Sequence, residues 1–382
     1  MAQTSVQLQA KLMREYYKDF SKYAKGRPPS RKVAWVTAFT PIEILEALDI
    51  AYIYPESYAA VIAASGKEQP LLEESTRQSL CGDCCSYSCC FEGSLILESA
   101  PRGLPPKPDV LIATNNQCNT LPNWWNILAQ RYQAPLIVLD YPGEAADRES
   151  AYRYVTEQHR TFITRMEELS GNTLDMERLA EVIGNSRASV EAWRRVTALF
   201  ATRDILPPML FDGISHLITS RCKPETAQLY SAMEQELAAM PEADPEKSAL
   251  FWLGYPLWYH AKRYLPELLG NCRISGSNYI TWWSLDYLGD TPLEQLFCAY
   301  NNTFLNLTPE TKRICLTECI RQSGAVGAIT LHNKSCKCDF VSARHISIPQ
   351  AELEIDMIDR NFWDVSRAKR QIEVLLESVC TA

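Results

Sequence analysis

The segment 109–140, DVLIATNNQCNTLPNWWNILAQRYQAPLIVLD, decides the fold. Residues 109–113 and 135–140 are short runs rich in Val, Ile and Leu, which is typical of buried parallel strands. The stretch 124–132 between them has the length and pattern of a helix, so the segment predicts a strand–helix–strand unit with parallel strands. Its first strand runs into a polar loop that ends in Cys118.

The same alternation recurs on both sides of this segment. The predicted strands are 32–36, 51–54, 109–113, 135–140, 249–254, 279–283, 325–331 and 350–355. The main predicted helices are 5–25, 42–48, 124–132, 146–170, 175–201, two within 209–240, one near 257–269, and 364–379. This order predicts an α/β protein with two α/β domains and a helical insert between them. We place the first domain at 1–160, and the helical segment with the second domain at 161–382.

Composition excludes several classes of protein. Of the 382 residues, 46% are hydrophobic and 22% charged, which is typical of a globular chain and excludes a mostly disordered one. The net charge of -8 gives no support for binding nucleic acid. No apolar run reaches the ~18 residues of a membrane-spanning helix, and the first 20 residues lack the apolar core of a signal peptide. We therefore expect a cytoplasmic protein without a membrane or nucleic-acid partner.

The cysteine content is unusual. Fourteen cysteines are many for a cytosolic enzyme and too sparse for a small disulfide scaffold. In a reducing compartment, clustered thiols indicate metal binding or catalysis. Five of them lie within 81–90, in a loop whose Gly, Asp and Ser residues offer no core to bury them.

Three thiols are expected to converge. Cys118 follows one predicted strand and Cys336 follows another in the second domain, while Cys85 lies in the polar loop 81–90. Ligands of open α/β sheets bind beyond the carboxyl ends of the strands. Thiolates from three loops suit zinc or an iron–sulfur cluster, and the spacing alone leaves the metal open. Ordinary burial is the better prediction for six others: Cys222, Cys272, Cys298, Cys315, Cys319 and Cys380.

Several separated motifs occur in a recognisable order. They are the stretch 34–64, CSYS at 85–88, NNQCNT at 115–120, PLIVLDYP at 135–142 and GAITLHNKSCK at 327–337. With these motifs the chain resembles the family of 2-hydroxyacyl-CoA dehydratases and benzoyl-CoA reductases. The likeness is nearest to the alpha subunit of 2-hydroxyglutaryl-CoA dehydratase, and it covers almost the whole chain.

The resemblance implies a cofactor and a reaction. It implies two Rossmann-like lobes with one [4Fe-4S] cluster in the cleft between them, held by Cys85, Cys118 and Cys336. It implies an ATP-dependent radical dehydratase, in which one-electron reduction of a CoA thioester gives a ketyl and loss of water gives an enoyl-CoA. The implied partners are the CoA-thioester substrate, a homologous second subunit or a second copy of this chain, and a separate iron–sulfur activator that uses ATP.

Alternatives stay open at this point. The extra thiols Cys81, Cys84, Cys89, Cys90 and Cys338 either reflect local variation or contribute to a larger or second iron–sulfur cluster. A second possible function is that of a reductase of the same superfamily, which acts on an aromatic CoA thioester as benzoyl-CoA reductases do, or on small molecules at a larger cluster. From a different class, it is a zinc-binding or electron-carrying protein without activity on CoA esters.

Five further residues are candidates for the site. Thr40 and Glu43 lie where the family places substrate contacts, although a helix cap for Thr40 and a solvated helix face for Glu43 are the better explanations. Asn115 and Asn116 can donate hydrogen bonds to cluster sulfides or to the thioester oxygen, or serve a turn. His332 lies four residues before Cys336 and can pass a proton, although a histidine at a strand end is more often structural.

Overall fold

The computed structural model describes residues 3–23, 31–78, 84–205, 207–259, 261–336 and 346–380. It contains two four-stranded sheets in which every strand pairing is parallel. The predicted α/β class with parallel sheets is therefore confirmed. The division of the chain at 160/161 stays a prediction.

Both sheets have the same strand order. The first contains β1 (Val33–Val36), β2 (Ala51–Ile53), β3 (Val110–Thr114) and β4 (Leu136–Leu139), in the order β2-β1-β3-β4. The second contains β5 (Ser248–Leu253), β6 (Cys272–Ser277), β7 (Gly327–Asn333) and β8 (Gln350–Ile355), in the order β6-β5-β7-β8. In each sheet the first strand is central, the second strand pairs with one side of it, and the third pairs with its other side, followed by the fourth. The direction of the strand order therefore reverses between the first and third strands. Ligands of open α/β sheets bind beyond the carboxyl ends of such a pair.

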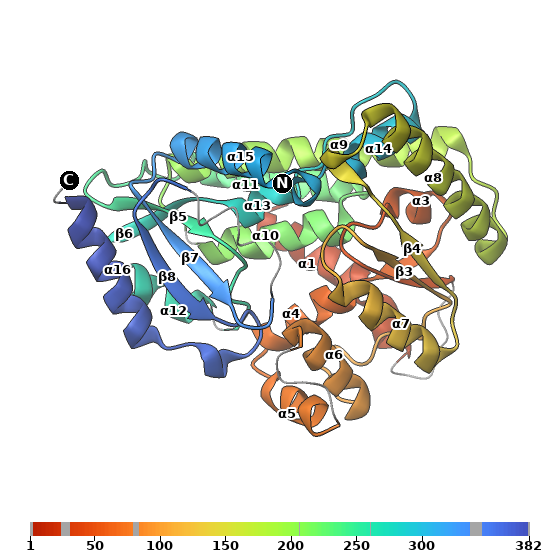
Figure 1. Cartoon of the computed structure of the whole chain (residues 1–382), viewed down its shortest axis with the longest axis horizontal. Helices are drawn as coiled ribbons and strands as arrows, with labels where there is room; N and C mark the ends of the chain where they lie inside the picture. Colours follow the sequence, from red (N-terminus) through yellow and green to blue (C-terminus); the bar gives the residue numbers. More distant parts are fainter. Residues whose placement is uncertain are drawn as a thin grey trace.

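Helices cover the sheets and connect them (Figure 1). Around the first sheet lie α1 (Ser5–Tyr16), α2 (Lys18–Tyr23), α3 (Ile42–Ala47), α4 (Pro55–Ala64), α5 (Gln69–Arg77), α6 (Ser86–Ile96) and α7 (Thr120–Tyr132). Long helices follow: α8 (Arg148–Ser170), α9 (Met176–Ala198), α10 (Pro207–Ser220) and α11 (Pro224–Ala238). The rest are α12 (Ala261–Leu269), α13 (Asn278–Trp282), α14 (Pro292–Asn301), α15 (Pro309–Ser323) and α16 (Val365–Cys380).

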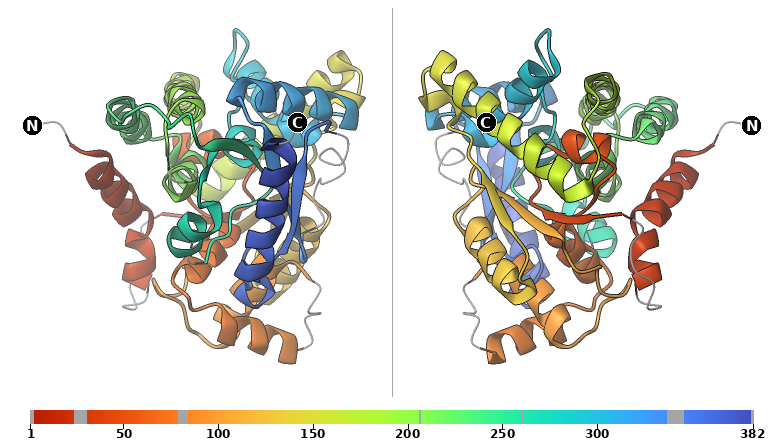
Figure 2. Two further views of the ribbon diagram at one scale, coloured as in Figure 1. Left: turned by 90° about the vertical axis from the view of Figure 1, so that its left-hand side faces the viewer. Right: turned by 90° about the vertical axis from the view of Figure 1, so that its right-hand side faces the viewer.

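The helices α9 and α10 bridge the two sheets. Helix α9 packs against α3 and against α13 and α14. Helix α10 contacts both α1 and α12. The two turned views show α1 and α2 standing beside these green helices at the outer side of the molecule (Figure 2). One continuous hydrophobic core therefore includes residues of both sheets and of the long helices.

The central strands of the first sheet are tied together at both ends. At the amino ends, the backbone N–H of Val33 donates to the Asp109 carboxylate at 2.8 Å. At the carboxyl ends, the N–H of Thr114 donates to the Thr37 hydroxyl at 3.0 Å. Both threonines are fully buried, so these bonds hold the loops that follow β1 and β3 at a fixed spacing.

The expectation of a strand at 279–283 is wrong. The strand here is β6, and residues Asn278–Trp282 form the helix α13. High β-propensity of the aromatic residues misled the prediction, because tertiary packing places them on a helix that faces a cavity. The observed strand contains Gly276, where a Cβ atom would lie 2.7 Å from the Phe251 ring. The close packing of β6 against Phe251 of β5 therefore requires a glycine at this position.

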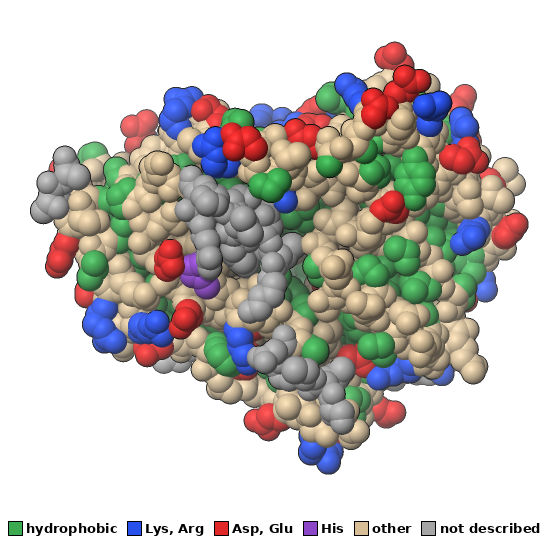
Figure 3. Space-filling model, in the orientation of Figure 1, with side chains coloured by type: hydrophobic (Ala, Val, Ile, Leu, Met, Phe, Trp, Pro, Cys, Tyr) green, Lys and Arg blue, Asp and Glu red, His purple; other side chains and the backbone are tan. Residues whose placement is uncertain are grey.

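The surface carries its charge unevenly. In the space-filling view, charged side chains lie mainly along the upper and lower edges, and hydrophobic side chains gather toward the side of β3, β4 and α7 (Figure 3). Ile127 on α7 and Val138 on β4 are among the large hydrophobic residues that are exposed. Within the described ranges, no helix has the length and apolar character needed to cross a bilayer.

Helix α6 is held by close backbone packing, which gives a first prediction. A Cβ atom at Gly93 would lie 2.0 Å from the backbone oxygen of Leu71 on α5. Gly93→Ala should therefore lower the free energy of unfolding by about 1–3 kcal/mol or more, measured by urea denaturation, because the backbone must shift. The matched control is Gly184→Ala on α9, where nothing lies within 4 Å. It should be neutral or slightly stabilising, and equal effects of the two substitutions would contradict the packing argument.

Candidate active site

A cavity of about 420 Å³ lies beyond the carboxyl ends of the strands of both sheets. Four strand-end loops supply lining residues: Ala38 and Phe39 after β1, Gln117 and Cys118 after β3, Tyr255 and Trp258 after β5, and Cys336 after β7. These four strands are the central pairs at which the order reverses. Parallel pairing therefore predicts the cavity, since it gathers these loops at one edge of each sheet.

The three predicted thiols, Cys85, Cys118 and Cys336, all line this cavity. Burial, followed by the charges of Cys336 and Cys118, raises the pKa of the Cys85 thiol well above its usual value. In the part of the chain that the structure describes, no three His, Cys, Asp or Glu side chains are close enough to hold a single metal ion.

Two of these thiols lie at helix amino ends. Cys85 is the N-cap of α6 without a side-chain capping hydrogen bond, and the backbone N–H groups of Ser88 and Tyr87 only partly oppose the rise of its pKa. Cys118 precedes α7, where burial raises its thiol pKa and the backbone N–H groups of Leu121 and Thr120 act in the opposite direction. Free N–H groups of a first helical turn stabilise negative charge, but burial outweighs this effect and holds the pKa of both thiols above the usual value.

Hydrogen bonds join two loops of the second sheet to the start of α6. The hydroxyl of Ser335, next to Cys336, donates to the hydroxyl of Ser86 at 2.8 Å, and both are buried. The indole N–H of Trp258, in the loop after β5, donates to the hydroxyl of Tyr87. Two loops of the second sheet are therefore bonded to the start of α6, which carries Cys85.

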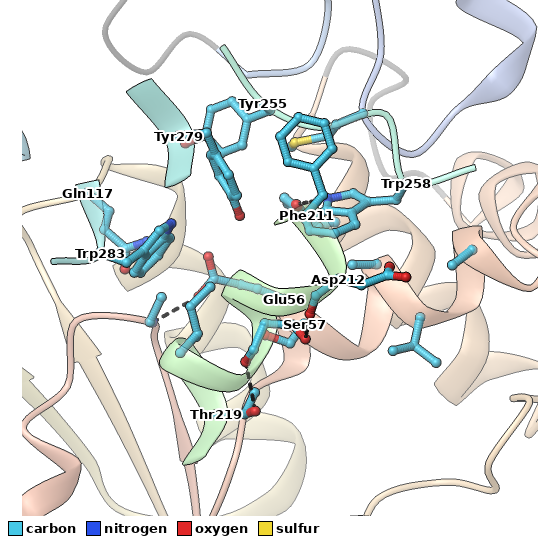
Figure 4. Close-up of a pocket in the computed structure, with 18 of the residues that line it drawn as sticks. Glu56, Ser57, Gln117, Phe211, Asp212, Thr219, Tyr255, Trp258, Tyr279 and Trp283 are labelled. Atoms are coloured by element: carbon cyan, nitrogen blue, oxygen red, sulfur yellow. Dashed lines mark hydrogen bonds between the residues drawn. The ribbon is translucent and has the colours of Figure 1, made fainter. Parts of the chain in front are cut away.

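The structure also identifies a carboxyl group that sequence reasoning missed. Glu56, on the first turn of α4, lines the cavity, and its carboxylate accepts from the N–H of Ala38 at 3.2 Å. Burial raises its pKa to about 7, against smaller opposing effects of that bond and of the Gln117 side chain. In Figure 4, Glu56 and Gln117 face the cavity from different elements. The available signal was an acidic residue just after a strand end, followed by an apolar helix.

The remaining walls are strongly aromatic. The rings of Phe39 and Trp283 stack with centroids 4.7 Å apart, and those of Tyr255 and Tyr279 lie 5.4 Å apart. Tyr255, Tyr279 and Trp258 are drawn around the cavity in Figure 4. Such rings exclude water and offer flat apolar surfaces to a ligand.

Thr40 and Glu43 do not line the cavity. The predicted solvated position of Glu43 is wrong, because this side chain is completely buried. The predicted cap role of Thr40 is also wrong: the N-cap of α3 is Pro41, and the buried Thr40 hydroxyl has no hydrogen-bond partner in the described structure. The Thr40 carbonyl accepts from Arg221 at 3.3 Å. A catalytic role for Thr40 or Glu43 therefore gains no support from position.

Glu43 belongs to a buried polar network behind the cavity. Its carboxylate lies 3.0 Å from Arg221 Nε, and it accepts hydrogen bonds from the hydroxyls of Tyr287, Tyr300 and Ser186. Burial raises the pKa of Glu43, but Arg221 and the two tyrosine hydroxyls outweigh it and hold the pKa below its usual value. The network joins α3 to α9, to the turn after α10 and to α14.

Breaking this network gives a second prediction. Glu43→Gln should lower the free energy of unfolding at neutral pH by about 3–5 kcal/mol, because it leaves the buried Arg221 without its counter-charge. The lowered pKa of Glu43 means that its contribution is complete above the usual value of 4.5 and is lost as the pH falls through the folded value. The deficit of the variant should therefore shrink in acid. The control is Glu310→Gln, in the exposed pair with Arg313, which should not measurably change stability. Equal effects would reject the network's role.

The other predicted residues lie around the cavity rather than in its lining. The side chain of Asn115 bonds to Asp140 and accepts from the N–H of Tyr141 at 3.1 Å, so it connects β3 to β4. The amide atoms of Asn116 are buried without a hydrogen-bond partner in the described structure, which leaves them able to bond a ligand. His332 Nε2 lies 3.2 Å from the Glu352 carboxylate on β8. Their proposed chemical roles stay predictions.

The extra cysteines are placed only in part. Cys89 and Cys90 are buried on α6, and Cys84 is partly exposed just before this helix. None of these three is among the lining residues of the cavity. Burial raises the pKa of the Cys89 thiol to about 11. Cys81 and Cys338 lie outside the described residues. Cys222, Cys272 and Cys298 are buried, as expected of ordinary core thiols, and Cys315 and Cys319 are partly exposed.

Comparison with known proteins agrees with this geometry. The family model for "2-hydroxyglutaryl-CoA dehydratase, D-component" matches residues 37–379. The chain belongs to this family. Family membership confirms the resemblance that the sequence motifs indicated and places the chain among proteins whose named members are enzyme subunits.

Individual relatives are similar over nearly their whole length. Lactoyl-CoA dehydratase subunit alpha of Anaerotignum propionicum is 26% identical over 391 residues, which cover 94% of this chain and 92% of the relative. The (R)-2-hydroxyisocaproyl-CoA dehydratase alpha subunit of Clostridioides difficile is 25% identical over 96% of this chain and 93% of its own length. One subunit of the benzoyl-CoA reductase of Thauera aromatica is 26% identical over 90% of this chain and 88% of its own length.

Proposed function

We propose that this chain is the iron–sulfur subunit of an ATP-dependent 2-hydroxyacyl-CoA dehydratase. The carrying observation is that three thiols from three separate loops line one cavity in a chain of this family. In this proposal each sheet with its helices is a Rossmann-like lobe, and the cavity is part of the cleft between them. The net reaction converts a 2-hydroxyacyl-CoA to an enoyl-CoA and water.

The donor set fits a [4Fe-4S] cluster held by Cys85, Cys118 and Cys336. Thiolates are the usual ligands of such clusters, and N–H groups that point at the sulfurs tune and stabilise them. A cluster also needs its three thiolates spread around it, so the absence of a compact single-ion site among the described residues does not conflict with this fit. When bound, such a cluster would supply the very low-potential electron that the thioester needs for loss of its 2-hydroxyl and of a neighbouring C–H proton. The net reaction removes only water, so this electron is regained.

The chain's own residues provide a proton acceptor. Glu56 and Asp212 are the carboxyl groups among the described lining residues, and Glu56 lies at the carboxyl edge of the first sheet, beside the loops that carry the thiols. A carboxyl with a pKa of about 7 is suited to exchange protons at neutral pH. We propose that Glu56 takes the proton from the acidified C–H group, oriented by the N–H of Ala38 and the side chain of Gln117.

The far part of the cavity suits the thin arm of coenzyme A. Helices α4 and α10 supply small or polar lining residues, namely Ser57, Ala60, Val61, Ala64, Ser65, Asp212, Ser215 and Thr219. These positions recur every three or four residues, so one face of each helix borders the channel. Small side chains leave room for an extended flexible chain, and the hydroxyls and Asp212 can bond its amide groups.

Partners follow from the family. The dehydratase relatives are named alpha subunits, which supports a second, homologous subunit or a second copy of this chain as partner. A separate iron–sulfur activator that uses ATP would deliver the electron. A benzoyl-CoA-type reductase is the second candidate, favoured by the similarity to the Thauera aromatica reductase and by the aromatic walls of the cavity.

The ligand assignment can be tested with anaerobically prepared protein. Cys118→Ala should abolish cluster incorporation and, with activator, ATP and a reductant, the dehydration of 2-hydroxyacyl-CoA esters. The control Cys315→Ala, on α15 and away from the cavity, should keep both. About four iron and four sulfide per wild-type chain are expected for one cubane. Full iron in Cys118→Ala would reject the assignment, a colourless zinc protein would reject the function, and a much higher iron count would favour a larger or second cluster.

The proton acceptor gives a separate prediction. Glu56→Gln should lower kcat by about 10²–10⁴-fold while the cluster still assembles, because the amide cannot take up a proton. The wild-type rate should rise as the pH increases through about 7, when Glu56 loses its proton, and the variant should lack this rise. Glu373→Gln on the exposed face of α16 is the control and should keep the wild-type profile. An unchanged kcat and pH profile in Glu56→Gln would exclude this role.

A further inference from the structure

The cavity has two ends with different chemistry. Helix α4 starts directly after β2, so Glu56 on its first turn lies at the carboxyl edge of the first sheet, beside the loops that carry the thiols. The helix then runs back toward the amino edge, and Ala64 lies about 12 Å farther along its axis. Arg102 precedes β3 and lines this far end. A thioester that reacts at the thiol end must therefore hold its acyl group there and its coenzyme A arm toward α4's far end.

The thiol end presents aromatic surface to that acyl group. Phe39 and Trp283 stack at an interplanar angle of 9°, and both rings are buried. Tyr279 lies near this pair, with its ring 6.0 Å from Trp283 and 5.4 Å from Tyr255. Trp282 is stacked on Phe304 at 5.1 Å. Phe39, Tyr255, Tyr279, Trp282 and Trp283 all line the cavity, and this aromatic lining favours a flat or branched apolar group.

The charges around the cavity also favour an apolar acyl group. The carboxyl groups among the described lining residues are Glu56 and Asp212, and neither can neutralise a second carboxylate. The one described lining cation is Arg102, whose guanidinium lies over the Tyr17 ring at 5.8 Å, at the other end of the cavity. A carboxylate on the acyl group would therefore be desolvated against aromatic rings, and the described lining residues at that end provide no counter-charge.

We propose that the acyl group of the substrate is bulky and apolar, aromatic or branched, and carries no second carboxylate. The inference rests on the proposed function and adds the substrate class. The aromatic lining residues, Trp283 among them, are its recognition surface, and the described lining offers a dicarboxylic acyl group no cation at the thiol end.

A substrate panel tests this proposal. The full chain with its partner subunit, activator, ATP and reductant is assayed with 2-hydroxy-3-phenylpropanoyl-CoA, 2-hydroxy-4-methylpentanoyl-CoA, lactoyl-CoA and 2-hydroxyglutaryl-CoA. The first two should have the highest kcat/KM, and 2-hydroxyglutaryl-CoA should be lower than the better of them by about 100-fold or more. Equal or faster turnover of 2-hydroxyglutaryl-CoA or lactoyl-CoA overturns the substrate class and leaves the dehydratase function intact. No turnover of any of the four overturns the proposed function.

A binding measurement separates recognition from chemistry. The tryptophans 258, 282 and 283 line the cavity, so the phenyl ester should change intrinsic fluorescence when titrated without activator or ATP, and 2-hydroxyglutaryl-CoA should bind at least about tenfold more weakly. Trp283→Leu should weaken binding of the phenyl ester about tenfold and that of lactoyl-CoA much less. The matched control is Trp363→Leu, outside the cavity lining, which should keep wild-type affinities. Equal affinity of the wild type for the phenyl and glutaryl esters overturns the proposal even if a variant does not fold.

Discussion

Parallel pairing is the constraint on which the site depends. It sends the carboxyl ends of all strands in a sheet to one edge, and the strand order β2-β1-β3-β4, repeated in the second sheet, opens the loops there between the central strands. The cavity uses this edge in both sheets, so residues more than two hundred positions apart meet. The buried hydrogen bond between Ser335 and Ser86 is the most direct link between the two edges.

Burial separates two carboxyl groups that look alike in sequence. Glu43 and Glu56 both lie on the first turn of a helix that follows a strand. Arg221 and three hydroxyl groups surround Glu43, so it stays ionised and serves the architecture. Glu56 has no such cation, burial raises its pKa to about 7, and it lines the cavity. The environment, rather than the local sequence, decides which carboxyl is suited to proton transfer.

Sequence patterns were sufficient where local signals and tertiary packing agree. The strands at 110–114 and 136–139 are predicted correctly, because short apolar runs that lie between turn-forming residues are typical of buried strands. Aromatic residues 279–283 were assigned to a strand because their local propensity conflicts with their final environment on α13. Glu43 was assigned to a solvated face because nothing in the sequence reveals that Arg221, a distant residue, neutralises it.

The sequence by itself determined the α/β class, the family, and the three cysteines that follow strands or precede helices. These features follow from short-range patterns, since strand length, helix capping and loop motifs are written in neighbouring residues. Only the tertiary structure decided that the three thiols share one cavity with Glu56, and that aromatic rings form its walls. Those relations depend on how two sheets face each other, and this arrangement arises from packing and hydrogen bonds between residues far apart in the chain.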